Sequence, residues 1–246
     1  MFQYQAPPDL LKNKIVLVTG AGSGLGRAAA LIYAQHGATV ILLGRTEKKL
    51  EATYDSIVKA GGAEPALMVV DLETAGDNEY QEIANTLTNE FGRLDGLLHS
   101  AGTSSATLPL QHISLSSWNK VLQVNLTAGF GLSKYCLPLL LLAPTASLIF
   151  TSSRAGRSTR AYWGAYAVAK HGVETLMEIF HQELQNTSHI RVNSLNPGPC
   201  ATALRKAIFP AENPASLPQP EHLMPLYLYL MGDESLHEQG KQFEAQ

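Results

Sequence analysis

The stretch Lys14-Ile-Val-Leu-Val-Thr-Gly-Ala-Gly-Ser-Gly-Leu-Gly26 joins a run of aliphatic residues to a turn rich in glycine. An apolar run that ends in such a turn indicates a buried strand, and helical periodicity follows the turn as far as about His36. Four glycines stand at this first strand-to-helix junction, namely Gly20, Gly22, Gly24 and Gly26. Without side chains, the turn lets the backbone approach a pyrophosphate, whose charge can meet the helix N-terminus. A tight connection with no ligand is the alternative, because a glycine-rich turn alone is weak evidence.

Short aliphatic runs alternate with stretches of helical periodicity along the rest of the chain. Further strands are predicted at Thr39–Leu43, Ala66–Val70, Leu94–His99, Ser147–Thr151 and Ile190–Leu195, and helices at Glu47–Ala60, Asp77–Phe91, Leu115–Leu137, Tyr162–Gln185 and Glu221–Met231. Strands that are apolar on both faces and separated by helices indicate a parallel sheet that is covered on each side. We therefore predict the α/β class, with one Rossmann-type domain over residues 1–246 and a doubly wound parallel sheet of about seven strands. The proline-rich segment at about 203–222 is predicted to be a substrate loop or lid.

Composition argues against several other classes of protein. The 246 residues are 45% hydrophobic and carry a formal net charge of −3, which gives no basic surface for a nucleic-acid backbone. Cys136 and Cys200 match no metal-ligand spacing and allow one disulfide at most, so we expect no metal site and a reducing, cytoplasmic location. The apolar run Leu137 to Ala143 is interrupted by Pro138 and is far shorter than the ~20 residues of a membrane span. Residues 1–8 lack the character of a signal peptide, and no membrane segment is expected.

The end of the second predicted strand favours one form of the dinucleotide cofactor. Roughly 20 residues after the glycine turn, an NAD-binding sequence offers a carboxylate to the ribose hydroxyls. This chain has Gly44 and Arg45 there, so nothing repels a 2′-phosphate and the guanidinium can pair with it. NADP(H) is therefore predicted rather than NAD(H), a solvated arginine at a helix start being the alternative.

Tyr166 and Lys170 are four residues apart on a predicted helix and so share one side of it. An ammonium group near a phenol favours the phenolate and lowers the tyrosine pKa from about 10, which makes the phenol usable as an acid or base nearer neutral pH. Chance also produces this spacing, so the pair needs support from the rest of the chain.

That support comes from a resemblance. The glycine-rich Thr19-Gly-Ala-Gly-Ser-Gly-Leu-Gly26 together with Tyr166-Ala-Val-Ala-Lys170 resembles the short-chain dehydrogenase/reductase family. Further motifs follow in the family's order over nearly the whole chain: Asp71, His99-Ser-Ala-Gly102, Asn125 in Val-Asn-Leu, Ser153 thirteen residues before Tyr166, and Asn196-Pro-Gly198 followed by Thr202. Three segments, Tyr4–Pro7, Val40–Arg45 and Met224–Leu228, look closest to the YciK-type bacterial oxidoreductases of that family.

The resemblance implies hydride transfer between NADP(H) and a small carbonyl or secondary-alcohol substrate. Tyr166 would exchange a proton with the substrate oxygen, Ser153 would hydrogen-bond that oxygen, and Lys170 would lower the tyrosine pKa and bind the nicotinamide ribose. Asn125 would hold a water that links Lys170 to solvent, although without the family a satisfied core amide is as good an interpretation. Ser152 competes with Ser153, but the spacing to Tyr166 favours Ser153.

The resemblance also implies where the cofactor binds. Asp71 would contact the adenine, Thr202 would meet the cofactor after the sixth strand, and the Cys200 N–H would be free for the carboxamide. The predicted cofactor-binding residues are Gly20, Ser23, Gly24, Leu25, Gly26, Arg45, Asp71, Leu72, Ala101, Gly102, Tyr166, Lys170, Pro197, Gly198, Cys200 and Thr202. A homo-oligomer, a dimer or a tetramer, is expected on the resemblance alone, through the two helices predicted at Leu115–Leu137 and Tyr162–Gln185.

Two departures from the family pattern and two alternatives accompany these predictions. Ser100 stands where the family usually has asparagine, and the chain stops at Gln246 without a common Asp-Gly-Gly ending. Five cations, Arg154, Arg157, Arg160, Arg205 and Lys206, could meet an anionic substrate or belong to a solvated surface. The non-enzymatic alternative is an NADP(H)-binding sensor or scaffold, which would have no need of a proton donor such as Tyr166.

Overall fold

The apolar runs form the strands of one parallel sheet, in a computed structural model that describes residues 1–246. The sheet has seven strands in the order β3-β2-β1-β4-β5-β6-β7. Their bounds are β1 Ile15–Thr19, β2 Thr39–Gly44, β3 Ala66–Val69, β4 Gly96–His99, β5 Ala146–Thr151, β6 Ile190–Asn196 and β7 Gln242–Glu244. All six strand pairs are parallel, which confirms the predicted α/β class and the doubly wound sheet.

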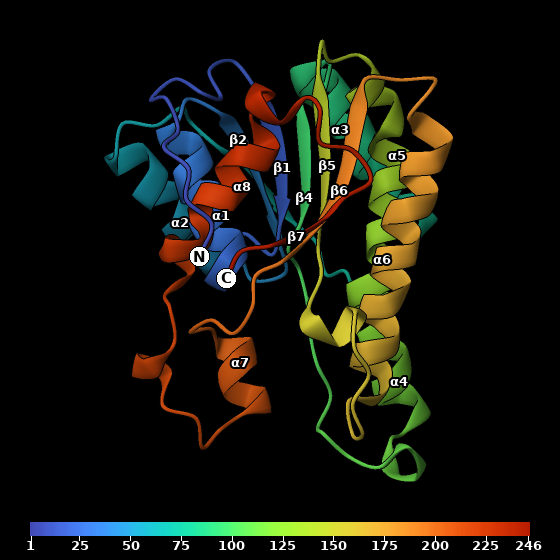
Figure 1. The fold of residues 1–246 in the computed structure, drawn as a ribbon. Helices are drawn as coiled ribbons and strands as arrows, with labels where there is room; N and C mark the ends of the chain where they lie inside the picture. The colour runs from blue at the N-terminus through green and yellow to red at the C-terminus, as the bar shows by residue number, and fades with distance from the viewer.

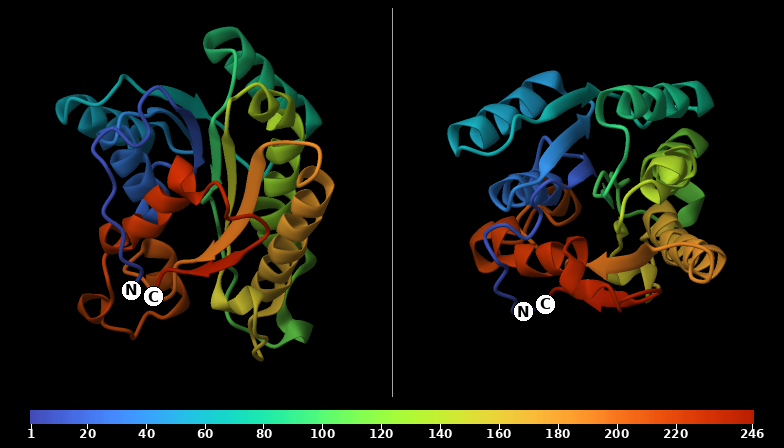
Figure 2. Two further views of the ribbon diagram at one scale, coloured as in Figure 1. Left: turned by 45° about the horizontal axis from the view of Figure 1, so that its top comes forward. Right: turned by 90° about the horizontal axis from the view of Figure 1, so that it is seen from above.

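Helices cover both faces of the sheet (Figure 1). They are α1 Gly24–Gln35, α2 Glu47–Lys59, α3 Asp77–Phe91, α4 Leu115–Leu122, α5 Ala128–Leu141, α6 Gly164–Leu184, α7 Ala203–Ile208 and α8 Met224–Met231. The two views of Figure 2 place α1, α2 and α8 on one face and α3, α5 and α6 on the other. None of these helices is both long enough and apolar enough to cross a membrane.

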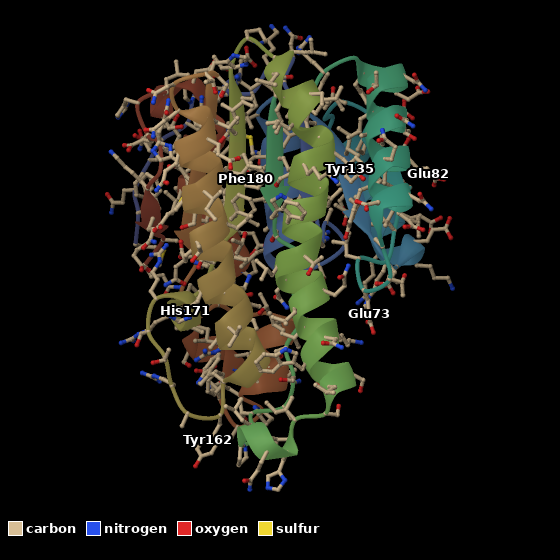
Figure 3. All side chains as sticks on the ribbon, turned by 90° about the vertical axis from the view of Figure 1, so that its right-hand side faces the viewer. Glu73, Glu82, Tyr135, Tyr162, His171 and Phe180 are labelled. Carbon is tan, nitrogen blue, oxygen red and sulfur yellow. The ribbon has the colours of Figure 1, made fainter.

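Each face of the sheet buries its own apolar core. The first core joins α1 and α8 to the sheet and includes Tyr33 and Tyr227, and the second joins α3, α5 and α6 to the opposite face. In Figure 3, Tyr135 lies between α5 and α3, while Phe180 of α6 points toward the sheet, where its ring stacks on Phe150 of β5 at 6.2 Å. Strands buried on both faces explain why the sequence has continuous apolar runs rather than an alternating pattern.

The strand order reverses direction between β1 and β4, and this reversal creates a crevice at the carboxyl edge of the sheet. The chain leaves β1 toward β2 on one side and leaves β4 toward β5 on the other. The Thr19 hydroxyl, which is buried, bridges the two strand ends. It accepts hydrogen bonds from the N–H groups of Ser100 and Ala101, both at 3.0 Å, and donates to the Leu98 carbonyl at 3.4 Å.

Three of the predicted helices differ from the observed ones by more than one residue. The helix predicted at Leu115–Leu137 consists of α4, a π-helical turn at Gln123–Thr127 and α5, which continues through Pro138 to Leu141. The helix predicted from Tyr162 begins at Gly164, because Tyr162 has a φ of 74° and cannot belong to a right-handed helix. The last helix begins at Met224, after a 3₁₀ turn, rather than at Glu221.

The C-terminal third contains two elements that the sequence analysis did not locate. A two-turn helix, α7, lies inside the segment 203–222, and the rest of that segment consists of short turns. The seventh strand, β7, has only three residues, two of them exposed, and therefore lacks the apolar run that marks the others. Its pairing with β6 brings the end of the chain beside Asn196.

A close approach of two backbones fixes the loop after β5. This loop contains the 3₁₀ turn η3, Arg154–Gly156, which packs against α6. A Cβ at Gly156 would lie 2.6 Å from the Lys170 carbonyl oxygen and 2.8 Å from its carbonyl carbon. Only glycine allows this contact without a backbone shift.

We therefore expect Gly156→Ala to lower the free energy of unfolding by about 1–3 kcal/mol, the usual cost of overpacking a filled site. Gly129→Ala is the matched control, because a Cβ there would meet the Phe150 ring at 3.5 Å, an ordinary contact inside helix α5. Alanine is the better helix former, so the control should unfold within about 1 kcal/mol of the wild type. Urea denaturation of the two variants measures both values, and equal stabilities would contradict the proposed contact.

Candidate active site

The glycine turn after β1 is shaped by backbone contacts. Gly20 and Gly24 have φ values of 70° and 54°, in the region that favours glycine. A Cβ on Gly26 would lie 2.4 Å from the Gly20 oxygen, so the turn closes directly onto α1. Ser23 occupies the N-cap position of α1, yet its hydroxyl makes no capping hydrogen bond. The first N–H groups of this helix are thus left without a side-chain partner, which fits an anionic group of a dinucleotide.

A cavity of about 200 Å³ lies between this turn and the ends of β2 and β3. Arg45 lines it with a side chain 60% exposed, and its guanidinium lies 3.9 Å from the Glu73 carboxylate. Asp71 and Leu72 also line the cavity, and one Asp71 carboxylate oxygen accepts a hydrogen bond from the Glu73 N–H. The lining therefore offers a cation and a carboxylate at separate places, as the ribose phosphate and the adenine of NADP(H) require.

Lys49 is a lining residue of this cavity that the sequence analysis missed. It is the fourth residue after Arg45, in the first turn of α2. Arg45 and Lys49 thus both line the cavity in which a 2′-phosphate is expected. The helix start at Glu47 was predicted from the sequence, but only the fold shows that the Lys49 side chain lines this cavity.

A larger cavity of about 460 Å³ adjoins the first, and the two share Ala101 and Gly102. It brings together residues from separate parts of the sequence. The predicted residues that line it are Leu25, Ala101, Gly102, Asn125, Ser153, Tyr166, Lys170, Pro197, Gly198, Cys200 and Thr202. Gly20, Ser23, Arg45, Asp71 and Leu72 line the smaller cavity, whereas Gly24 and Gly26 line neither and shape the turn instead.

Tyr166 and Ser153 face each other in the larger cavity. Tyr166 is 8% exposed, and burial, the largest effect, raises its pKa above the ordinary 10.0. A hydrogen bond with the Ser153 side chain and the nearby charge of Arg205 act in the opposite direction. The predicted lowering of the Tyr166 pKa by Lys170 is therefore not found in this arrangement, because desolvation of the phenolate outweighs the favourable contacts. Ser153, and not Ser152, is the serine whose side chain acts on the pKa of the phenol.

Lys170 is almost completely buried, and its ammonium group donates a hydrogen bond to the Thr151 carbonyl at 2.7 Å. Its Nζ lies 5.8 Å from the centre of the Tyr166 ring. Burial lowers the pKa of Lys170 to about 8, while the carboxylate of Glu174 acts against that shift. An amine with such a pKa is mostly charged at neutral pH and can still release a proton.

Asn125 lies in the π-helical turn, and its side chain is satisfied by main-chain groups. The amide nitrogen donates to the carbonyls of Thr103 and Val121, both at 2.8 Å, and the amide oxygen accepts from the Thr103 N–H at 3.3 Å. The side chain thus anchors the loop after β4, as the satisfied-amide interpretation expected. The amide oxygen accepts one of the two hydrogen bonds that it can take and so keeps a lone pair for the water of the predicted relay.

The cations around the site divide into three kinds. Arg157 does not line the cavity: it pairs with Glu174 at 2.8 Å and with Glu244 at 2.6 Å and is therefore structural. Arg205 lines the cavity but forms two hydrogen bonds of 2.7 Å with Glu212. Arg154 and Arg160 line the cavity, are exposed and have no ion pair. Lys206, the fifth cation of the sequence cluster, lines neither cavity, so the cluster contributes two uncompensated charges to the site rather than five.

The end of the chain forms part of the site, which the sequence analysis also missed. The Gln246 side chain donates to the carbonyls of Pro197 and Pro199 at 2.7 and 2.8 Å and packs on Gly198, whose φ is 72°. Gln246 thus supports the loop that follows β6. Ser100, which stands where the family usually has asparagine, has a buried hydroxyl without a hydrogen-bond partner.

Comparison with known proteins agrees with this geometry. Residues 14–213 match the short chain dehydrogenase family. The uncharacterized oxidoreductase YciK of Escherichia coli K12 is 45% identical over 243 residues, which cover 99% of this chain and 96% of that protein. The predicted resemblance to YciK-type proteins is confirmed.

Solved structures extend the similarity to three dimensions. A short-chain dehydrogenase from Shigella flexneri 2a, complexed with NADP, is 44% identical with a TM-score of 0.94 and covers 97% of this chain and 99% of its own. A short-chain dehydrogenase from Escherichia coli CFT073, complexed with NADPH, is 44% identical with a TM-score of 0.95. The match covers 98% of this chain and 100% of that one. This chain belongs to the short-chain dehydrogenase family and is an oxidoreductase of that family.

Proposed function

We propose that this oxidoreductase transfers a hydride between NADP(H) and a carbonyl or secondary-alcohol substrate, with Tyr166 as the general acid and base. The observation that carries the proposal is the meeting of Tyr166, Ser153 and Lys170 in one cavity that adjoins the cavity of Arg45. The cofactors named for the Shigella flexneri and Escherichia coli CFT073 structures support the same conclusion.

The residues of the smaller cavity fit NADP(H) rather than NAD(H). The glycine turn and the open N-terminus of α1 would hold the pyrophosphate, and Asp71 would contact the adenine. Arg45, with Lys49 beside it, would pair with the 2′-phosphate, and the only carboxylate near its guanidinium, that of Glu73, lies 3.9 Å away. When bound, the cofactor supplies or accepts the hydride.

The proton step falls to Tyr166 and Ser153. In the reducing direction, the Tyr166 hydroxyl donates a proton to the carbonyl oxygen while the Ser153 hydroxyl donates a hydrogen bond to the same oxygen. The raised pKa of Tyr166 keeps the phenol protonated, as a proton donor must be. Lys170, whose pKa is about 8, then returns a proton to the Tyr166 phenolate.

Three broader features belong to the same proposal. The chain works as one domain over residues 1–246, with 203–222 as the substrate lid, because α7 and Phe209 line the cavity from that segment. We place the protein in the cytoplasm, where its two buried free cysteines would stay reduced. The alternative, an NADP(H)-binding sensor or scaffold, leaves the contact between Ser153 and the Tyr166 hydroxyl without a purpose.

The first prediction concerns cofactor choice. The purified protein should bind NADPH more tightly than NADH, and Arg45→Ala should reduce that preference by about tenfold or more, because it removes a charge-assisted phosphate contact. Fluorescence titration with both nucleotides measures the ratio. Lys59→Ala, at the far end of α2, is the control and should keep the wild-type ratio. Equal affinities for the two nucleotides, or an unchanged ratio in the Arg45 variant, would disprove the assignment.

The second prediction concerns the proton donor. Tyr166→Phe should lower turnover by about 10²–10⁴-fold and leave NADPH binding nearly intact, because only the hydroxyl is lost while the ring and its packing remain. Lys170→Ala should damage both turnover and cofactor binding, since its ammonium has two roles. NADPH oxidation with a carbonyl substrate and a parallel binding titration separate these effects.

The two serines provide the control for this prediction. Ser153→Ala should resemble Tyr166→Phe, whereas Ser152→Ala should be milder, because the Ser152 hydroxyl is buried and has no hydrogen-bond partner. Wild-type turnover in Tyr166→Phe would favour the sensor alternative instead.

An oligomer is proposed on the exposed side of α5 and α6. These helices run side by side with their outer surfaces toward the viewer in Figure 3. Four large apolar side chains are exposed on them, with Phe130 48%, Leu141 44%, Val168 49% and Ile179 47% exposed. Apolar side chains on neighbouring exposed helices favour association with a second copy.

We expect light scattering at micromolar concentration to give a dimer or a tetramer. Phe130→Glu should shift the protein toward the monomer, because the interface would have to bury a carboxylate. Val58→Glu is the matched control: Val58 is 46% exposed on α2, outside the proposed interface, and its replacement should leave the mass unchanged. A wild-type protein that is only monomeric would refute the proposal.

A further inference from the structure

The larger cavity has an apolar inner surface beyond the catalytic hydroxyls. Trp163, just before α6, and Phe209, just after α7, both line it, and the centroids of their rings lie 5.9 Å apart. Leu204 and Ile208 of α7 extend the same apolar wall. Trp163 in turn contacts the Tyr166 ring at 5.8 Å. A substrate whose carbonyl reaches Tyr166 would therefore lay an apolar or aromatic body along these side chains.

The charges that line the cavity are strongly unbalanced. Four of them are positive, namely Lys170, Arg154, Arg160 and Arg205, and one is negative, Glu244. Glu244 is already bound by Arg157 and by the Asn196 amide, and Arg205 is bound by Glu212. Lys170 is engaged with Thr151 and belongs to the catalytic group.

Arg154 and Arg160 are the two charged residues of the cavity lining that have no partner. Neither guanidinium has an ion pair or a hydrogen bond anywhere in the described chain, although Arg157 between them is fully engaged. Both come from the loop that follows Ser153, and both line the cavity while remaining exposed. They therefore offer two unpaired guanidinium groups at the solvent-exposed part of the cavity lining, whereas Tyr166 is buried.

We propose that the substrate of this oxidoreductase carries an anionic group, of carboxylate or phosphate chemistry, at the opposite end of an apolar body from its reacting carbonyl, and that Arg154 and Arg160 bind this group. The proposal rests on the proposed function, since it assigns the substrate class of the same site. Its physical basis is that a guanidinium offers paired donors that match carboxylate and phosphate oxygens, and that a positive cavity draws anions toward it.

The test uses pairs of aldehydes that differ only in charge. The acids 3-formylbenzoate, 4-formylbenzoate and 4-formylcinnamate place the anion at increasing distances from the carbonyl, each is compared with its methyl ester, and 4-formylphenyl phosphate provides the phosphate arm. With NADPH at low ionic strength, at least one anion should exceed its ester in kcat/KM by about tenfold, mostly through KM. The preference should shrink as salt is added. The arm with the higher kcat/KM distinguishes a carboxylate from a phosphate.

Variants identify the residues responsible. Arg154→Gln and Arg160→Gln should each lower kcat/KM for the preferred anion severalfold and leave the neutral esters within about twofold. Lys59→Gln removes a charge far from the cavity and should change neither value. Thermal shift with NADPH present gives a second readout, in which the anions should raise Tm in the wild type and less so in the double arginine variant.

The outcomes separate this inference from the proposed function. Reduction of acids and esters with equal kcat/KM would support the oxidoreductase function and overturn the anion proposal. Binding of the anions that depends on the arginines, without turnover of any aldehyde, would support the anion site and count against the proposed reaction. If no aldehyde is turned over and no anion binds in a way that depends on the arginines, the anion proposal and the proposed function are both overturned.

Discussion

The divergence of the chain at the ends of β1 and β4 is the constraint on which the rest of the site depends. Two parallel strands that continue to opposite sides of a sheet leave a crevice that no side chain of the sheet can fill. The Thr19 hydroxyl holds the two strand ends together at the bottom of that crevice. The glycine turn and the Ala101-Gly102 segment then become its two walls, and both cavities meet along them. Any loop attached to a neighbouring strand end is directed to the same place.

Burial then sets the acid–base properties of the groups that meet there. Desolvation disfavours charge on every side chain, so it raises the pKa of Tyr166 and lowers that of Lys170. The two pKa values therefore move apart, which favours passage of a proton from the Lys170 ammonium to a Tyr166 phenolate. The same cause lowers the pKa of His99 to about 3 and keeps that ring neutral beneath the site, where it meets Ser133 at 2.9 Å. A neutral histidine adds no charge that would oppose the ammonium of Lys170.

The sequence allowed prediction of those features that follow from periodicity and from local motifs. Apolar runs marked six of the seven strands, and their parallel arrangement required the glycine turn, Ser153 and Asn196-Pro-Gly198 to lie at one edge. Strand β7 could not be predicted because three residues, two of them exposed, carry no pattern of their own. The sequence also could not show which of Arg157 and Arg160 is paired, because the two arginines have similar sequence surroundings. Only the fold reveals that Glu174 of α6 and Glu244 of β7 converge on Arg157 and leave Arg160 free. Partners distant in sequence decide whether such a charge is structural or available.

The substrate side of the site is built differently from the cofactor side. The proposed cofactor contacts come from strand ends and from the start of α1, whereas the proposed substrate cavity is closed by α7 and the short turns after it. A chain of contacts links this proposed lid to helix α6, which carries Tyr166. Glu212 holds Arg205, whose guanidinium lies 3.9 Å above the Phe209 ring, and Phe209 meets Trp163, which contacts Tyr166. Since the charge of Arg205 also favours ionisation of Tyr166, a shift of the lid would change both the shape of the cavity and the acidity of its proton donor. In the proposed function, substrate recognition and proton transfer would in this way be coupled through one small helix, while the cofactor site would remain unchanged.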